Sequence, residues 1–225
     1  MRFLVSEKAY ETPIASGRLR YERDGAPTGA LETWRLTQTT HGDQILRVDF
    51  DLRAVDGRSF LYHWVMTDVL EPQRLVYRYL HDKGGELSGN VLFTDGSIVN
   101  SRKLDEAHFE DELSNRPILF PTAIGAGVVA RAVRRGSADI GVLDMYSSDG
   151  GLLKLLPVNA LVRPQRTRDF KIVRVGRATH RATTVELSWG EQSYKLWLDL
   201  KHKWPLKVER EDGTIGQETR YIRYQ

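Results

Sequence analysis

Residues 44–55 read QILRVDFDLRAV, and their side chains alternate between two chemical classes. The apolar positions are Leu46, Val48, Phe50 and Leu52. The charged positions between them are Arg47, Asp49, Asp51 and Arg53. Successive side chains of a β-strand point to opposite faces of a sheet, so this period of two predicts a strand with one buried and one solvated face.

Segments of the same kind lie on both sides of this strand, separated by short turns. They cover residues 16–24, 28–39, 58–70, 73–81, 86–94 and 97–104. Asp56–Gly57 and Asp95–Gly96 lie in two of the connections, and Asp-Gly pairs favour tight hairpin turns. Short strands at regular spacing with Gly-containing turns indicate an antiparallel meander.

The pattern changes once, in residues 121–135, which read PTAIGAGVVARAVRR. At about 100° per residue, one broad face is formed by Gly125, Val128, Val129, Ala132 and Val133. The opposite side carries Arg131, Arg134 and Arg135. Thr122 suits a helix start and Gly136 a helix end. This predicts one amphipathic helix at about 122–135, packed on a sheet face or filling a barrel.

Strand patterns resume after the helix and continue to the end of the chain. They cover residues 138–147, 152–162, 168–179, 181–189, 194–200, 205–212 and 216–224. No internal repeat or linker interrupts them, and Pro164 is the only candidate boundary between subdomains. We therefore expect a single β-rich domain over residues 1–225.

The composition excludes several classes of chemistry. The 225 residues include no cysteine, which rules out disulfides, thiolate catalysis and cysteine-ligated zinc. The net charge of +3 is too small to indicate nucleic-acid binding without a clustered basic face. The N-terminal apolar run is shorter than a signal peptide requires. As it stands the sequence predicts a soluble cytoplasmic protein, and a periplasmic one if an export signal has been removed from it.

Two stretches carry more large apolar side chains than a solvated sheet explains. In residues 59–70, aromatic and apolar side chains occupy both faces of the expected strand, so either protein covers both faces or one face lines a cavity. In residues 193–213, Trp197 and Trp204 flank an expected hairpin. Core packing and an apolar ligand both explain such tryptophans, and we favour the ligand.

The order of these motifs resembles a group of bacterial β-spiral or open-barrel proteins. The most specific pieces are LFPT running into the helix, Leu119 to Val133, and SSDGG, Ser147 to Gly151. The group includes envelope-integrity proteins of the B type and related families, and is similar in fold to lipoprotein carriers of the LolA and LolB type. The resemblance implies a curved antiparallel sheet, a half-barrel or β-spiral, that wraps one helix and encloses an apolar cavity. It implies apolar-ligand or envelope roles and no catalytic residues.

Other candidate sites have a structural explanation that serves equally well or better. GAGVVA, residues 125–130, matches the glycine spacing of a dinucleotide-binding turn but lacks the parallel βαβ unit that this site needs, so we expect no cofactor. The six histidines form no metal-binding pair, and no metal is expected. The basic run 163–177 is most often a solvated face, and with the arginines of the helix it could also make a transient contact with a membrane surface. It carries only Phe170 as an interleaved aromatic, so nucleic acid is not an expected partner.

The resulting functional prediction is non-catalytic binding of an apolar or amphipathic, lipid-like small molecule in a cavity of the curved sheet. The expected walls are Trp34, Phe50, Tyr62, Trp64, Tyr77, Trp189 and Trp197. Arg131 and Arg134 would receive an acidic head group. The alternative is a cyclase or isomerase that acts on a polyketide-like or terpenoid-like substrate in the same cavity, with His63 or Asp68 as acid or base. A third possibility is an interaction scaffold with a fully packed core.

Overall fold

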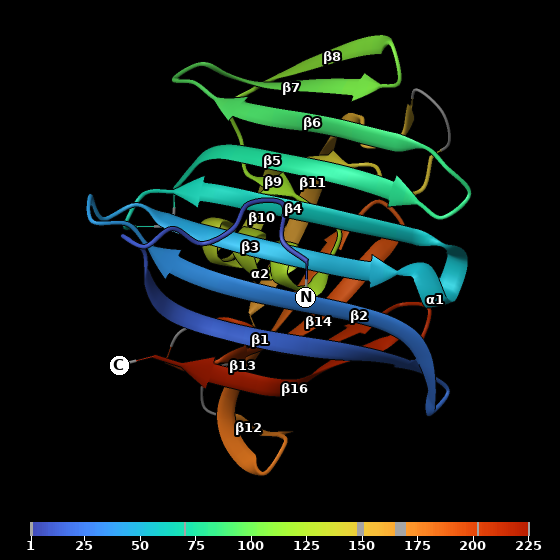
Figure 1. Cartoon of the computed structure of the whole chain (residues 1–225). Helices are drawn as coiled ribbons and strands as arrows, with labels where there is room; N and C mark the ends of the chain where they lie inside the picture. Colours follow the sequence, from blue (N-terminus) through green and yellow to red (C-terminus); the bar gives the residue numbers. More distant parts are fainter. Residues whose placement is uncertain (1, 70, 148–150, 165–169, 202, 225) are drawn as a thin grey trace.

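The computed structural model describes residues 2–69, 71–147, 151–164, 170–201 and 203–224. Within them, sixteen strands form one sheet in the order β8-β7-β6-β5-β4-β3-β2-β1-β16-β15-β14-β13-β11-β10-β9, and β12 pairs with β13. The pairs are antiparallel except β9 with β10. The sheet curves around α2, so the expected curved antiparallel sheet around one main helix is confirmed (Figure 1).

Seven of the eight strands of the first half were predicted from the sequence pattern, and β8 was not. They are β1 (Thr12–Arg23), β2 (Ala26–Gln38), β3 (Gln44–Leu52), β4 (Arg58–Met66), β5 (Pro72–His81), β6 (Glu86–Phe93), β7 (Ser97–Leu104) and β8 (Ala107–Ser114). The strand expected to reach Val55 ends at Leu52, because Arg53–Asp56 form the short helix α1. Gly57 ends α1 with a φ of 81°, which glycine adopts without strain.

The second half contains the main helix and the remaining strands. They are β9 (Ile118–Leu119), α2 (Ala123–Val133), β10 (Gly136–Leu143), β11 (Leu155–Pro164), β12 (Lys171–Val175), β13 (Ala178–Trp189), β14 (Gln192–Asp199), β15 (Pro205–Arg210) and β16 (Ile215–Arg223). The helix predicted at 122–135 is confirmed, with Thr122 as its N-cap. Residues 148–150 of the SSDGG motif and 165–169 of the basic run lie outside the described residues.

The glycines of the GAGVVA motif allow α2 to pack closely inside the sheet. A Cβ atom added at Gly125 would lie against the carbonyl oxygen of Phe120, and one added at Gly127 would lie 2.5 Å from Cγ of Pro205. All residues from Ala123 to Ala130 are buried. The motif is therefore the contact surface of a helix enclosed by strands, which matches the packing explanation of these glycines.

Polar side chains from the sheet satisfy the buried N-terminus of α2. The carboxylate of Glu32 on β2 accepts hydrogen bonds from the backbone N–H groups of Ala123 and Ile124, each at 3.1 Å. It also accepts one from the hydroxyl of Tyr21, at 2.5 Å. Oγ1 of Thr122 accepts the N–H of Gly125. The first N–H groups of a helix have no partner within it, so these acceptors remove a cost of about 1–3 kcal/mol for each buried group.

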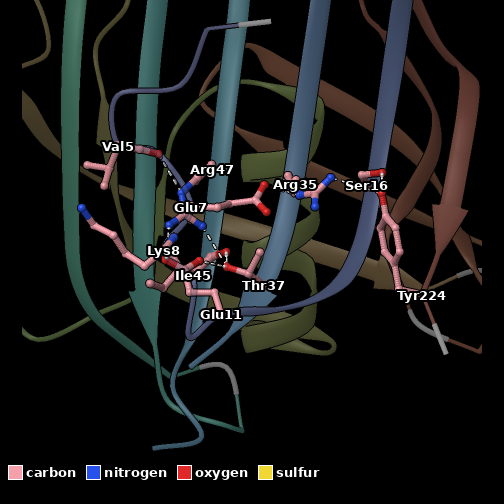
Figure 2. A network of polar contacts seen from close by, with 10 residues as sticks. All are labelled: Val5, Glu7, Lys8, Glu11, Ser16, Arg35, Thr37, Ile45, Arg47 and Tyr224. Carbon is pink, nitrogen blue, oxygen red and sulfur yellow. Dashed lines mark hydrogen bonds and ion pairs between the residues drawn. The ribbon is translucent and has the colours of Figure 1, made fainter. Parts of the chain in front are cut away.

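The N-terminal segment, residues 2–11, precedes β1 and covers the outer face of β2 and β3 (Figure 2). Arg47 of β3 donates to Val5 O at 2.9 Å, to Oγ1 of Thr37 at 2.8 Å and to Oε1 of Glu11 at 2.7 Å. The side chains of Arg47 and Glu11 are each 1% exposed. Burial would raise the pKa of Glu11, but the hydrogen bonds from Arg47 and Thr37 outweigh it and lower this pKa.

This segment corrects the expectation that the charged face of β3 is solvated. Arg47 and Asp49 are both buried, and Asp49 accepts the backbone N–H of Arg2 at 3.1 Å. On the neighbouring strand β4, Leu61 is also buried. Protein therefore covers both faces of these strands, with core on one side and buried polar pairs on the other.

Substitution Glu11→Ala tests the buried pair. We expect it to lower the free energy of unfolding by ~3–5 kcal/mol, because it leaves the Arg47 guanidinium buried and without its carboxylate. Urea denaturation measures this change. The double substitution Glu11→Met with Arg47→Met should recover most of the loss, since it removes both charges. A single variant as stable as the wild type would contradict the buried pair.

Candidate functional site

The concave side of the sheet is filled by protein around the N-terminal half of α2. The rings of Tyr62 and Phe120 stack with centroids 4.2 Å apart, and Trp64 contacts Tyr62 edge-on. Trp34 and Phe50 belong to the same buried cluster. These predicted ligand-binding residues therefore pack against other side chains as core, and none of them lines the cavities described below.

The other predicted aromatic walls are dispersed over the sheet. Tyr77 donates a hydrogen bond to Oδ1 of buried Asn100 and borders a cleft on the outer face. Trp189 is buried against Tyr194. Trp197 is partly exposed, and the ammonium groups of two lysines lie over its ring. The structure does not bring these three side chains together into one pocket.

Three cavities border the C-terminal half of α2, and we call the two that Arg131 and Arg134 both line the mouth cavities. The smaller, of about 350 Å³, is lined by Ala130, Arg131, Arg134, Pro164, Thr183, Val185, Leu198 and Lys203. The larger, of about 360 Å³, is lined by Met66, Val69, Glu71, Pro72, Val128, Arg131, Ala132, Arg134 and Trp204. Arg131 and Arg134, the arginines predicted to receive a head group, are common to both.

Arg131 lies over the indole of Trp204, with its guanidinium carbon 4.9 Å from the ring centroid. Its Nη1 atom is buried and has no hydrogen-bond partner among the described residues. Burial lowers the pKa of Arg131, which means that its charge is poorly compensated where it lies. A buried cationic N–H without an acceptor is costly, and an anion in the cavity would remove that cost.

The smaller mouth cavity combines apolar walls with positive charge. Val185 and Leu198 come from neighbouring strands, and Arg131, Arg134 and Lys203 contribute three cations. None of the lining residues that the structure describes is a carboxylate. Such an arrangement suits a ligand with an apolar body and an anionic group.

Sequence reasoning missed several lining residues because their position depends on where the helix ends relative to the sheet. Val185 and Leu198 look like ordinary inward positions of strands β13 and β14. Lys203 and Trp204 lie just before β15. The sequence signal was the pair of tryptophans in this hairpin, Trp197 and Trp204, of which Trp204 lines the larger mouth cavity.

His63 and Asp68 do not share a cavity. His63 borders an outer-face cleft of about 640 Å³, together with Arg74 and Val5. Burial, assisted by Arg47 and Arg74, lowers the pKa of His63 to about 4, so it is neutral at pH 7. Asp68 is exposed in the connection after β4. Among the described residues, those lining the mouth cavities include no histidine and one carboxylate, Glu71.

The outer-face cleft is larger, and ion pairs engage two of its four lysine and arginine side chains. Arg78 forms an ion pair with Glu86 at 2.9 Å, and Arg102 pairs with Asp111 at 3.1 Å. The described residues contain no cluster of three potential metal ligands. In the same part of the chain, no helix is long and apolar enough to cross a membrane.

The buried side chain of Glu218 is linked to the larger mouth cavity through Trp34 and Trp204. Glu218 accepts the indole N–H of Trp34 at 2.5 Å and the backbone N–H of Arg18 at 2.6 Å. The Trp34 ring in turn packs on Trp204, 5.3 Å between centroids. Burial raises the pKa of Glu218 to about 8, against the opposing effect of these hydrogen bonds.

Comparison with known proteins supports the fold. The sequence matches no protein-family model and no curated protein. Among solved structures, it is similar to a beta-barrel-like protein of the domain of unknown function DUF1849 from Brucella abortus. The TM-score is 0.56 at 10% sequence identity, over 95% of this chain and 98% of that chain. The protein thus has a β-barrel-like fold, while membership in the envelope-integrity or lipoprotein-carrier families stays a prediction.

The raised pKa of Glu218 predicts a pH dependence of stability. Between its unfolded value of 4.5 and about 8, the folded state holds a proton that the unfolded state has lost. The free energy of unfolding should therefore fall as pH rises through this window, on the order of 3–5 kcal/mol from this group.

Urea denaturation between pH 4.5 and pH 9 of the wild type and Glu218→Gln measures this effect. We expect the variant to have the shallower dependence, whatever its absolute stability. Parallel curves for the two proteins would show that Glu218 is not protonated in the folded state at neutral pH.

Proposed function

We propose that the protein is a non-catalytic binding protein for an anionic amphiphile. The apolar part of the ligand would lie in the mouth cavities, and its acidic group would pair with Arg131. The observation that carries this proposal is the buried Nη1 atom of Arg131, which has no acceptor among the described residues. A carboxylate or phosphate would accept from the guanidinium in two parallel hydrogen bonds.

The size of the site favours one alkyl chain or a small ring system. Small-molecule pockets span roughly 300–1,000 Å³, and each mouth cavity lies near the lower limit of this range. Burial of each methylene group contributes ~0.8 kcal/mol. Val185, Leu198 and the Trp204 ring would provide the apolar contacts, in place of the aromatic residues of the packed core.

The β-barrel-like fold is compatible with this proposal but does not identify a ligand. The alternative of a cyclase or isomerase has less support, because the described residues that line the mouth cavities include Glu71 as their one carboxylate and no histidine. General acid–base catalysis needs a group within hydrogen-bond reach of the reacting proton. His63 borders a different cleft and Asp68 is exposed.

Substitution Arg131→Met tests the proposal, because methionine keeps much of the apolar stem and removes the charge. We expect the affinity for dodecanoate to fall by at least about tenfold, since a hydrogen bond to a charged group contributes ~1.5–3 kcal/mol. The affinity for dodecanol should change little. Isothermal titration calorimetry with both compounds, below their aggregation concentrations, gives the comparison.

The matched control is Arg135→Met, at the same end of α2. Arg135 is exposed and is not among the residues lining either mouth cavity. This variant should bind dodecanoate like the wild type. An equal loss of dodecanoate affinity in both variants would show that only the net charge of the protein matters. Unchanged affinity in Arg131→Met would contradict the proposed site.

A further inference from the structure

The strand β12 forms a projection at one end of the molecule. It pairs with β13 and branches from the main path of the sheet, and in Figure 1 it extends beyond β16 at the lower edge. One side of the β12–β13 hairpin is fixed to the body of the protein. Val173 and Val175 form a small buried cluster with Leu206, and Gln217 donates a hydrogen bond to Arg174 O at 2.8 Å.

The other side of this hairpin exposes three large apolar side chains around one arginine. Ile172 lies opposite Arg181 in the strand register, and the N–H of Leu200 donates to Arg181 O, which aligns Leu200 in the same row. Phe170 precedes Ile172 by two residues, and the Arg181 guanidinium lies 4.5 Å from its ring centroid. Phe170 is 43% exposed, Ile172 60% and Leu200 39%. We call these four residues the tip patch.

The tip patch continues into the smaller mouth cavity. Two residues beyond Arg181, on the same face of β13, Thr183 lies opposite Leu198. Thr183 and Leu198 both line that cavity. Side chains two apart on a strand lie on one face of the sheet, so the exposed row and the cavity wall belong to one surface.

The charge around the tip patch is mainly positive, and its acidic neighbours in sequence are Asp169 and Asp199. Residues 170–181 contain Lys171, Arg174, Arg177 and Arg181 and no aspartate or glutamate. Lys201 and Lys203 follow the exposed Leu200 on the neighbouring connection. Exposed apolar side chains within a cationic border complement a surface with anionic groups above a hydrocarbon layer.

We propose that the tip patch docks on an anionic lipid bilayer. Phe170, Ile172 and Leu200 insert at the level of the head groups, and the surrounding lysines and arginines pair with lipid phosphates. Nucleic acid fits less well, because Phe170 is the only aromatic ring in the patch and its face is covered by Arg181. Docking here would place the smaller mouth cavity next to the membrane, but the docking does not depend on the cavity holding a ligand.

The absence of cysteine in the chain allows a specific test with the full-length protein. Ile172→Cys and Leu92→Cys each accept one environment-sensitive fluorophore. Leu92, on β6 at the other end of the molecule, is 45% exposed and serves as the matched control (Figure 1). We expect a blue shift of the probe at position 172, and none at position 92, with phosphatidylcholine–phosphatidylglycerol vesicles. Pure phosphatidylcholine vesicles should produce no shift at either position.

Sedimentation with the same vesicles measures the affinity. Each cation at the membrane surface contributes about fivefold, so Arg181→Glu should lower binding at least fivefold and 0.5 M salt should abolish it. The double substitution Phe170→Ser with Ile172→Ser should lower it further, while Leu92→Ser has no effect. All substituted side chains are exposed, and thermal unfolding verifies that each variant folds.

Several outcomes would overturn the docking proposal. The first two are equal binding to neutral and anionic vesicles and a blue shift at position 92 alone. The others are unchanged sedimentation of the tip variants with vesicles and release of the protein from the vesicles by duplex DNA. Dodecanoate binding, measured without vesicles, is a separate readout. If the protein binds anionic vesicles but not dodecanoate, the result would contradict the proposed function and still support the docking surface.

Discussion

The bond between the Glu32 carboxylate and the N-terminus of α2 is the constraint on which the rest of the structure depends. A helix enclosed by a curved sheet must find acceptors for its first N–H groups without water, and Glu32 and Thr122 supply them. This arrangement decides which end of the helix is buried. The opposite end, with Arg131 and Arg134, therefore emerges at the opening of the sheet, where the mouth cavities lie.

The dipole of α2 explains why positively charged side chains lie at the opening of the sheet. Arginines near a helix C-terminus interact favourably with its dipole, and this alone would account for Arg134 and Arg135. Arg131 requires more, because its guanidinium is stacked on Trp204 and one of its nitrogens is buried without an acceptor. Arg131 thus places a cationic group that lacks an acceptor beside apolar cavity walls. This is the physical basis for proposing an anionic amphiphile as the ligand.

The alternating pattern of residues 44–52 and the apolar stretch of α2 were sufficient to predict an antiparallel sheet and its helix, and the resemblance to open-barrel proteins added the curvature of the sheet. The pattern could not show that Arg47 is buried, because its cover comes from a segment near the N-terminus that lies far away in sequence. It also could not separate filled core from cavity wall, since both require the same side chains. Tyr62 and Trp64 fill the core, whereas Val185 and Leu198, which carry no special signal, line the opening.

We propose that the opening of the sheet holds an anionic amphiphile. Native mass spectrometry of the protein purified from its natural host, followed by solvent extraction, tests it most directly. We expect one bound molecule per chain with an acidic group and an alkyl or ring portion, which Arg131→Met no longer retains. A mass equal to that of the chain alone, together with no uptake of added dodecanoate, would contradict the account.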